Sequence, residues 1–122
     1  MSEKDALLLS ALSLAYVGDA VHSLFVRQGL VANSQLKPDA LHQLASSQVK
    51  AAAQAKLAET VESRLTETEA SVDLSGRNAK AHHKAKNQTM SDYRKATGLE
   101  AVIGYLYLTG QHDRIVELLT VQ

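Results

Sequence analysis

Two isolated carboxylates are the residues whose type and setting are best suited to chemistry. Asp19 is the only formally charged residue in the apolar run 6–26, and Glu100 is the only one in the run 96–110. Burying an unpaired carboxylate is costly, so each acid needs a cation, a set of donors or a retained proton. Two convergent carboxylates suit Mg²⁺, which takes its remaining ligands from water and substrate phosphate. The pattern therefore indicates a magnesium site.

Glycines beside both acids indicate that the helices carrying them pack closely. Gly18 precedes Asp19, and Gly98 and Gly104 flank Glu100. Glycine inside a helix costs about 0.5–1 kcal/mol relative to alanine, so its repeated use favours a close approach of backbones or of a ligand. If the two helices pack at these glycines, the carboxylates converge. The plainer interpretation is that each acid pairs with a lysine or arginine, or lies exposed at a groove.

The elements that must position these acids are predicted to be helices. Alanine and leucine dominate the sequence, aromatic residues make up 4%, and runs of alternating β-branched residues are absent. Hydrophobic spacing predicts helices over about 5–28, 66–74, 91–108 and 112–121, with one or two more within 38–62. Helix start and stop signals set these limits, among them Gly29, Pro38, a Thr66–Glu69 capping box, Ser91 and Gly110.

Length and composition indicate one all-α domain over residues 1–122. A chain of this length can bury a core, and the absence of cysteine excludes disulfides, thiolate zinc sites and cysteine nucleophiles. The first ten residues lack the features of a signal peptide. Asp19, His22 and three serines make the run 6–26 unsuited to a bilayer. We therefore expect a cytoplasmic protein without a membrane span.

The charge is balanced overall but polarised along the chain. Thirteen Lys and Arg face thirteen Asp and Glu, for a net charge of +0. Between positions 74 and 95, however, Asp92 is the only acid. Six basic residues lie in this stretch: Arg77, Lys80, Lys84, Lys86, Arg94 and Lys95. A local basic patch is what phosphate binding needs, although a run of charges is more often a solvated loop.

Four segments, in order, resemble the catalytic domain of the ribonuclease III family. The match is closest to its short branch, Mini-ribonuclease III, which lacks a separate double-stranded-RNA-binding domain. Leu14–Val21 (LAYVGDAV) resembles the signature helix, and Gly76–Lys80 (GRNAK) resembles the basic loop. Leu41–Ser47 with Val49, Gln54 and Ala55 resembles the middle helices, and Tyr93–Leu106 resembles the second acidic helix. The resemblance covers nearly the whole chain.

The resemblance implies a ribonuclease III-like helical bundle that forms a homodimer and hydrolyses double-stranded RNA with Mg²⁺. Asp19 and Glu100 fall on two of the family's metal-binding acids and are the expected catalytic residues. Tyr16 falls where the longer enzymes carry a phenylalanine at the dimer interface. Those enzymes hold two further acids at the positions of Ala15 and Thr97, so we expect weaker metal binding here. In the short branch the substrate is typically a precursor of 23S ribosomal RNA.

The basic loop would supply the contacts to RNA phosphates. The residues expected to make them are Arg77, Asn78, Lys80, Lys84 and Lys86. His82 and His83 have no nearby acid in the sequence. They and His42 are expected to be exposed or beside RNA, and the roles of all three stay open. A need for a ribosomal protein as partner also stays open.

Two other classes of function compete with the enzyme. One is a non-catalytic dimeric helical module that binds RNA or a ribosomal particle. The other is a plain dimeric scaffold, which would leave both acids and the basic loop unexplained. Because both acids are present, the sequence favours the endoribonuclease.

Overall fold

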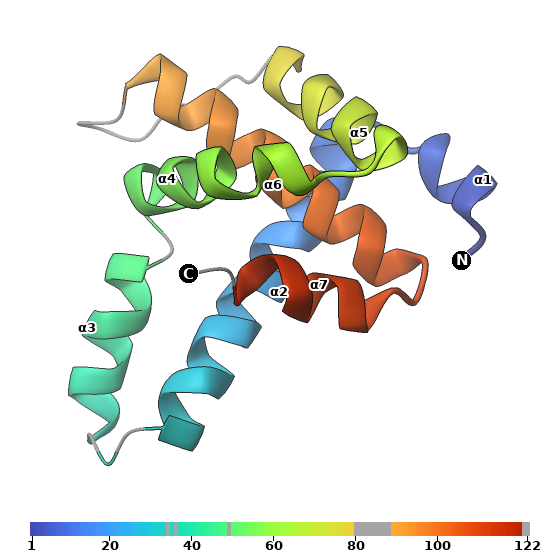
Figure 1. The fold of residues 1–122 in the computed structure, drawn as a ribbon. Helices are drawn as coiled ribbons and strands as arrows, with labels where there is room; N and C mark the ends of the chain where they lie inside the picture. Colours follow the sequence, from blue (N-terminus) through green and yellow to red (C-terminus); the bar gives the residue numbers. More distant parts are fainter. Residues whose placement is uncertain (34, 36, 49, 80–88, 121–122) are drawn as a thin grey trace.

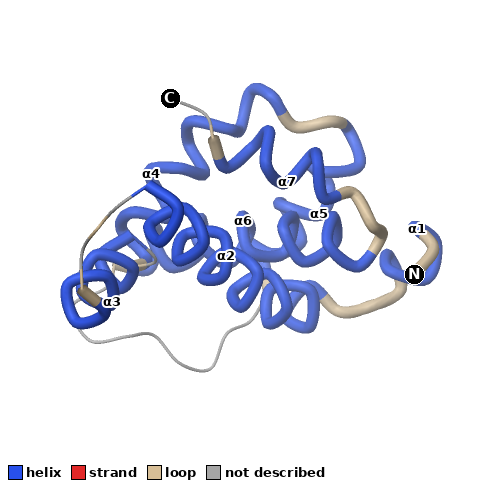
Figure 2. The backbone as a smooth tube through the Cα atoms, turned by 90° about the horizontal axis from the view of Figure 1, so that it is seen from below, coloured by secondary structure: helices blue, strands red, loops and turns tan. Residues whose placement is uncertain are grey.

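The structure is a computed structural model that describes residues 1–33, 35, 37–48, 50–79 and 89–120. These residues form helices and loops without any strand, which confirms the predicted all-α class (Figures 1 and 2). The helices are α1 (Glu3–Leu7), α2 (Ala11–Asn33), α3 (Pro38–Gln48), α4 (Ala51–Val61), the 3₁₀ helix η1 (Glu62–Arg64), α5 (Glu67–Asn78), α6 (Met90–Leu108) and α7 (His112–Leu119).

The first predicted helix is two helices in the structure. The Ser10 hydroxyl accepts a hydrogen bond from the Ser13 backbone N–H at 3.0 Å, which caps a new helix and separates α2 from α1. Gly29 was expected to end this helix, but α2 continues to Asn33, whose side-chain amide donates to the Gly29 carbonyl at 2.9 Å. Asp19 therefore lies in the first half of one long helix.

The start signals of the later helices are confirmed in part. Thr66 and Glu69 form the predicted capping box, in which Glu69 accepts from the Thr66 backbone N–H at 2.9 Å. α5 extends to Asn78, so part of the predicted basic loop is helical. α6 begins at Met90, one residue before the predicted cap Ser91, because the Thr89 hydroxyl caps it by accepting from the Asp92 backbone N–H at 3.0 Å.

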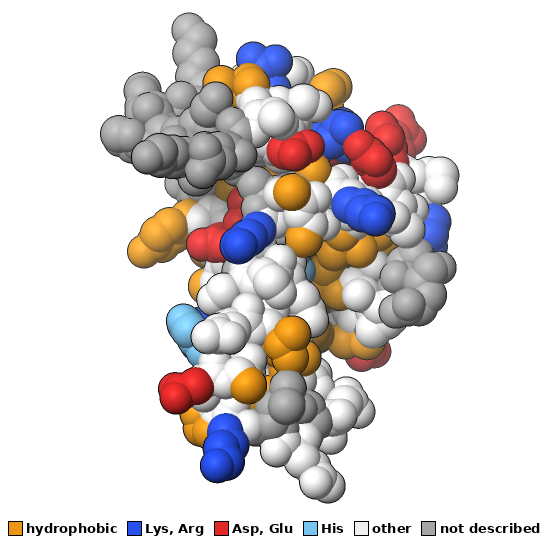
Figure 3. Space-filling view, turned by 90° about the vertical axis from the view of Figure 1, so that its left-hand side faces the viewer, with side chains coloured by type: hydrophobic (Ala, Val, Ile, Leu, Met, Phe, Trp, Pro, Cys, Tyr) orange, Lys and Arg blue, Asp and Glu red, His pale blue; other side chains and the backbone are white. Residues whose placement is uncertain are grey.

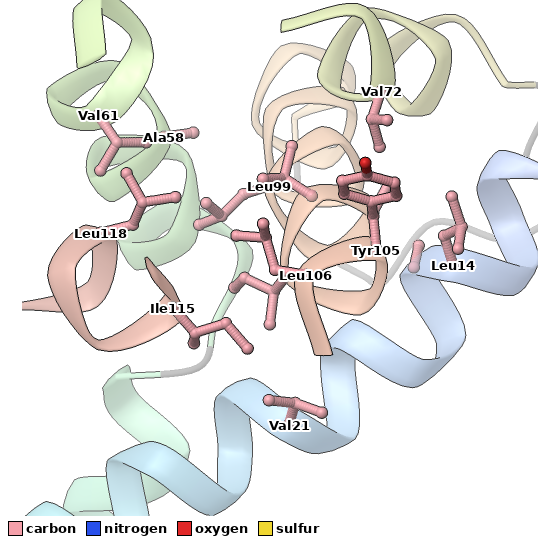
Figure 4. Packing of buried hydrophobic residues seen from close by; sticks show 14 of the residues in the cluster. Leu14, Val21, Ala58, Val61, Val72, Leu99, Tyr105, Leu106, Ile115 and Leu118 are labelled. Carbon is pink, nitrogen blue, oxygen red and sulfur yellow. The ribbon is translucent and has the colours of Figure 1, made fainter. Parts of the chain in front are cut away.

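α6 is the central helix of the fold, and it carries Glu100. Every residue from Ala96 to Leu106 except Glu100 is buried. α6 packs against α2, α5 and α4 (Figure 1), and Leu99 and Leu106 meet α7 and α4 side chains in the core (Figure 4). The buried Tyr105 hydroxyl donates to Glu3 at 3.2 Å, which ties α1 to the same helix. This packing fixes the position of Glu100.

Two parts of the fold are less buried than its core: the helical pair of α3 with the end of α2, and the C-terminal end of α6. α3 and the C-terminal half of α2 extend from the rest as a helical pair (Figure 1). Tyr107, the residue directly after the buried stretch of α6, is 42% exposed and stacks on His112 with a centroid separation of 5.1 Å. None of the helices in the described ranges has the length and hydropathy of a membrane span.

Candidate active site

Two glycines let the backbones of α2 and α6 touch where the helices cross. A Cβ atom placed on Gly18 would lie 1.7 Å from the Glu100 carbonyl oxygen. A Cβ atom placed on Gly104 would lie 1.9 Å from the Leu14 carbonyl oxygen. No side chain fits at either position without moving the helices apart, since these neighbours are backbone atoms. The predicted close packing at Gly18 and Gly104 is therefore present.

This crossing brings Asp19 and Glu100 into side-chain hydrogen-bond contact. Glu100 is partly buried, whereas Asp19 is exposed. The apolar surroundings of both acids suggest burial, and for Asp19 this was wrong, because the outer face of α2 is open: Leu12 is 38% and Tyr16 83% exposed. The site thus has one inner and one outer carboxylate, 81 positions apart in the sequence.

The inner carboxyl is strongly perturbed. Burial raises the pKa of Glu100 to about 9, and the hydrogen bond to Asp19 and the charge of Asp19 act in the same direction. A hydrogen bond donated by the Gln54 side chain opposes this shift. Within the described residues, neither acid forms a salt bridge with lysine or arginine. Glu100 therefore keeps its proton at neutral pH unless a cation takes the place of that proton.

The raised pKa predicts a pH-dependent stability of the metal-free protein. Unfolded Glu100 titrates near 4.5 and folded Glu100 near 9, so the folded form binds the extra proton between these values. The stabilisation from this proton is full below pH 4.5 and is lost as pH rises towards 9. Glu100→Gln removes the effect, because a neutral amide can still donate to Asp19 and accept from Gln54.

We expect Glu100→Gln to be more stable than the parent in EDTA at pH 8, by about 1–3 kcal/mol, and little different at pH 5. Urea denaturation of both proteins at the two pH values measures this. A stability difference that is the same at pH 5 and pH 8 would show that Glu100 titrates normally.

Two residues near the acids escaped the sequence reasoning. Gln54 of α4 is 3% exposed and contacts Glu100. His22 lies one turn after Asp19, is 4% exposed, and has its pKa lowered by burial despite the charge of Asp19, so it is neutral at neutral pH. Each is a polar residue at a buried position of an apolar helix face. This position is the one feature of the sequence that could have indicated a role at the site.

At the two positions where the resemblance implies further acids in the longer enzymes, this chain carries buried residues without a carboxylate. Ala15 and Thr97 are 7% exposed, and the Thr97 hydroxyl donates to the Tyr93 carbonyl at 2.9 Å. Throughout the described ranges, no group of three or more His, Cys, Asp or Glu is placed to hold a metal ion. The candidate site therefore offers two carboxylates, of Asp19 and Glu100.

Arg77, the first residue predicted to bind RNA, is committed to an internal ion pair. Its Nε donates to Asp73 Oδ2 at 3.0 Å, and its side chain is 22% exposed. Gly98 makes room for the pair, because a Cβ atom there would lie 2.3 Å from Asp73 Oδ1 and 2.9 Å from Arg77 Cγ. Burial raises the pKa of Asp73, and Arg77 opposes this shift. Arg77 is therefore paired within α5, and its side chain packs against Gly98 of α6.

The remaining predicted RNA contacts divide into two groups. Asn78 is exposed at the end of α5. Lys80, Lys84 and Lys86 lie outside the described residues, as do His82 and His83, whereas His42 is exposed on α3. On the face shown in Figure 3, the Lys and Arg side chains of the described residues lie apart from one another among acids and apolar groups.

Tyr16, the predicted interface residue, stands on the open face of α2. With Asp19, Leu24 and Tyr107 it lines a pocket of about 440 Å³. A second pocket, of about 510 Å³, is lined by His22 and by Phe25, Leu57, Leu119 and their neighbours, and its lining includes neither acid. The open face of α2 thus carries an exposed aromatic ring and an apolar hollow beside Asp19.

Comparison with known proteins decides the family. Residues 12–111 match the model of the ribonuclease III domain. This chain belongs to the ribonuclease III family. It is 46% identical over 113 residues to the Mini-ribonuclease 3 of Enterococcus faecalis, covering 91% of this chain and 86% of the relative. It is 42% identical over 118 residues to the Mini-ribonuclease 3 of Streptococcus pneumoniae, covering 95% and 92%. The resemblance to the short branch is confirmed.

A solved structure supports the same fold. The crystal structure of a protein from Fusobacterium nucleatum superposes with a TM-score of 0.82 at 26% identity, covering 91% of this chain and 88% of that one. The ribonuclease III-like helical bundle predicted from the sequence is confirmed. Membership of the ribonuclease III family also confirms the predicted activity, an endoribonuclease that cleaves double-stranded RNA.

Proposed function

We propose that this ribonuclease III family enzyme uses Asp19 and Glu100 to hold a Mg²⁺ ion, and that it matures a 23S ribosomal RNA precursor in the cytoplasm. The observation that carries the metal proposal is the contact of two carboxyl groups without a cationic partner in the described part of the chain. One or two carboxylates are the usual protein share of a Mg²⁺ site, with water and phosphate completing the coordination. The donor set therefore fits Mg²⁺.

The two carboxyl groups take different parts in this proposal. Glu100 is the inner ligand, held by the buried α6, and it gives up its retained proton when the cation enters. Asp19 is the outer ligand, exposed where an RNA phosphate can reach the same ion. When bound, Mg²⁺ would supply Lewis acidity at the scissile phosphate and activate water for attack on it. Asp19 and Glu100 orient these components by fixing where the cation sits.

Recognition of the RNA would depend on contacts to its phosphates and on the two-fold symmetry of a homodimer. A-form RNA is read mainly through its shape, 2′-hydroxyls and phosphates. Arg77, Asn78, Lys80, Lys84 and Lys86 are proposed to contact the phosphates, with Arg77 weakened by its pairing to Asp73. A homodimer formed through Tyr16 would place one active site on each strand. Tyr16 is 83% exposed, as an interface residue of an isolated subunit should be.

The substrate proposal is tested by cleavage of a transcript that carries the double-stranded ends of a 23S precursor, with and without Mg²⁺. Cleavage at one site on each strand, and only with a divalent cation, is expected. A long duplex of unrelated sequence is the control. Cleavage of both at equal rates and at scattered positions would contradict a precursor-specific role, and repeating the assay with ribosomal proteins added shows whether the enzyme needs one as a partner.

The metal affinity should be modest. With Ala15 and Thr97 in place of two acids, water and RNA phosphate must supply more of the coordination. Binding must also remove the proton of Glu100. We therefore expect cleavage to keep rising with Mg²⁺ up to the millimolar range and to rise further between pH 7 and pH 9. Saturation at low micromolar Mg²⁺ at neutral pH would contradict this expectation.

A further inference from the structure

Gln54 is the one buried polar side chain of α4 among the described residues. It is 3% exposed, and the other buried positions of this helix are Ala55, Ala58 and Val61. This face of α4 packs against α6, the helix of Glu100. A polar side chain is costly to bury unless it is hydrogen-bonded, so its presence among small apolar residues calls for a reason. The contact of Gln54 with Glu100 supplies that reason.

Three helices meet at the Glu100 carboxyl group. Gln54 reaches it from α4 and donates a hydrogen bond, while Asp19 reaches it from α2. Because Gln54 is buried and Asp19 exposed, the carboxyl group is held from the protein side and approached from the open side. A side chain held in this way has few orientations available, which is the condition for a well-placed metal ligand.

The chemical type of Gln54 suits such support. A neutral amide donates to a carboxylate without neutralising it, so the negative charge stays available for a cation. Lysine or arginine at this position would compete with the metal ion, and leucine or methionine would leave the carboxylate desolvated without a donor. Among the described residues the site has two acids, so the orientation of Glu100 matters more than in a site with further ligands.

We propose that Gln54 is a positioning residue that orients the Glu100 carboxylate towards the divalent cation and thereby strengthens metal binding. This inference rests on the proposed role of Glu100 as a metal ligand. Gln54 itself would touch neither the ion nor the RNA. It acts through Glu100, in the way that hydrogen-bonded partners of metal ligands support those ligands.

The experiment compares Mn²⁺ binding to the parent protein and to Gln54→Met by calorimetry in the absence of RNA. Methionine keeps the length and shape of glutamine but donates no hydrogen bond. We expect Mn²⁺ to bind about 10-fold or more weakly to the variant, since loss of such a partner typically costs about 10–100-fold in affinity. Cleavage should fall at low Mg²⁺ and recover at high Mg²⁺, with KM for RNA unchanged.

Val61→Ala is the matched control, because it weakens the same buried face of α4 two turns from Gln54. It should lower stability without changing Mn²⁺ affinity. Gln54→Asn keeps the amide but shortens it, and should weaken Mn²⁺ binding as well if Gln54→Met folds too poorly for measurement.

Unchanged Mn²⁺ affinity in a folded Gln54 variant would overturn the proposal, as would an equal loss of affinity in Val61→Ala. The proposed function fails separately: if Glu100→Gln binds Mn²⁺ as tightly as the parent, Glu100 is not a ligand. If Glu100→Gln binds Mn²⁺ more weakly than the parent but Gln54→Met binds it equally well, only the positioning role of Gln54 is refuted.

Discussion

Asp19→Asn and Glu100→Gln should each reduce cleavage of double-stranded RNA by more than about 100-fold. Both replacements keep the size of the side chain and remove one of the two carboxylates that the described residues bring to the site. Changes to residues that merely support metal ligands already cost about 10–100-fold, so loss of a ligand should cost more. The measurement is the single-turnover cleavage rate, with enzyme in saturating excess over RNA, at Mg²⁺ concentrations that increase in 10-fold steps.

Fold and RNA binding should survive in both variants. Asp19 is exposed, and the amide of Gln at position 100 can keep the hydrogen bonds of the neutral Glu100. Asp113→Asn, an acid in the first turn of α7, is the control and should cleave at the parent rate. If either site variant cleaves like the parent, its acid does not perform the chemistry.

Gly18→Ala should destabilise the protein by at least about 3 kcal/mol. Its Cβ atom would lie 1.7 Å from the Glu100 carbonyl oxygen, a backbone atom that cannot move unless α2 and α6 separate. Such a separation would also pull Asp19 away from Glu100, so the surviving folded protein should bind metal poorly. Urea denaturation and Mn²⁺ calorimetry measure the two effects.

Gly29→Ala provides the control within the same helix. Beyond its own turn of helix, no atom lies within 4 Å of the Cβ position at Gly29, and its backbone is helical. Alanine there should be neutral or stabilising by up to about 1 kcal/mol, because it reduces the freedom of the unfolded chain. Similar stabilities of the two alanine variants would mean that the helix crossing at Gly18 is not tightly packed.

The convergence of the two acids could be predicted from the sequence. Glycine is unfavourable inside a helix unless another backbone approaches closely, and here glycines lie next to the single charged residue of each apolar run. Gly18 and Gly104 do allow the contact of α2 with α6. The exposure of Asp19 could not be predicted in the same way. Its apolar neighbours Leu12 and Tyr16 suggest burial, yet they lie on an open face of a single subunit.

The supporting residues were harder to predict because their partners are distant in sequence. Gln54 meets Glu100 only through the packing of α4 on α6, and an isolated glutamine in an alanine-rich helix has no characteristic spacing. The sequence places Arg77 in a run of basic residues that predicts RNA contacts. In the structure it pairs with Asp73, four residues earlier on α5. A helical prediction that had extended to Asn78 would have placed these two on one face.

The most direct test is the anomalous scattering of Mn²⁺ in crystals of the protein. A manganese peak within about 2–2.5 Å of carboxylate oxygens of both Asp19 and Glu100 is the result expected from one shared ion. A peak bound elsewhere, or bound to one acid while the other points away, would contradict the assignment of these two residues as joint ligands of the catalytic metal.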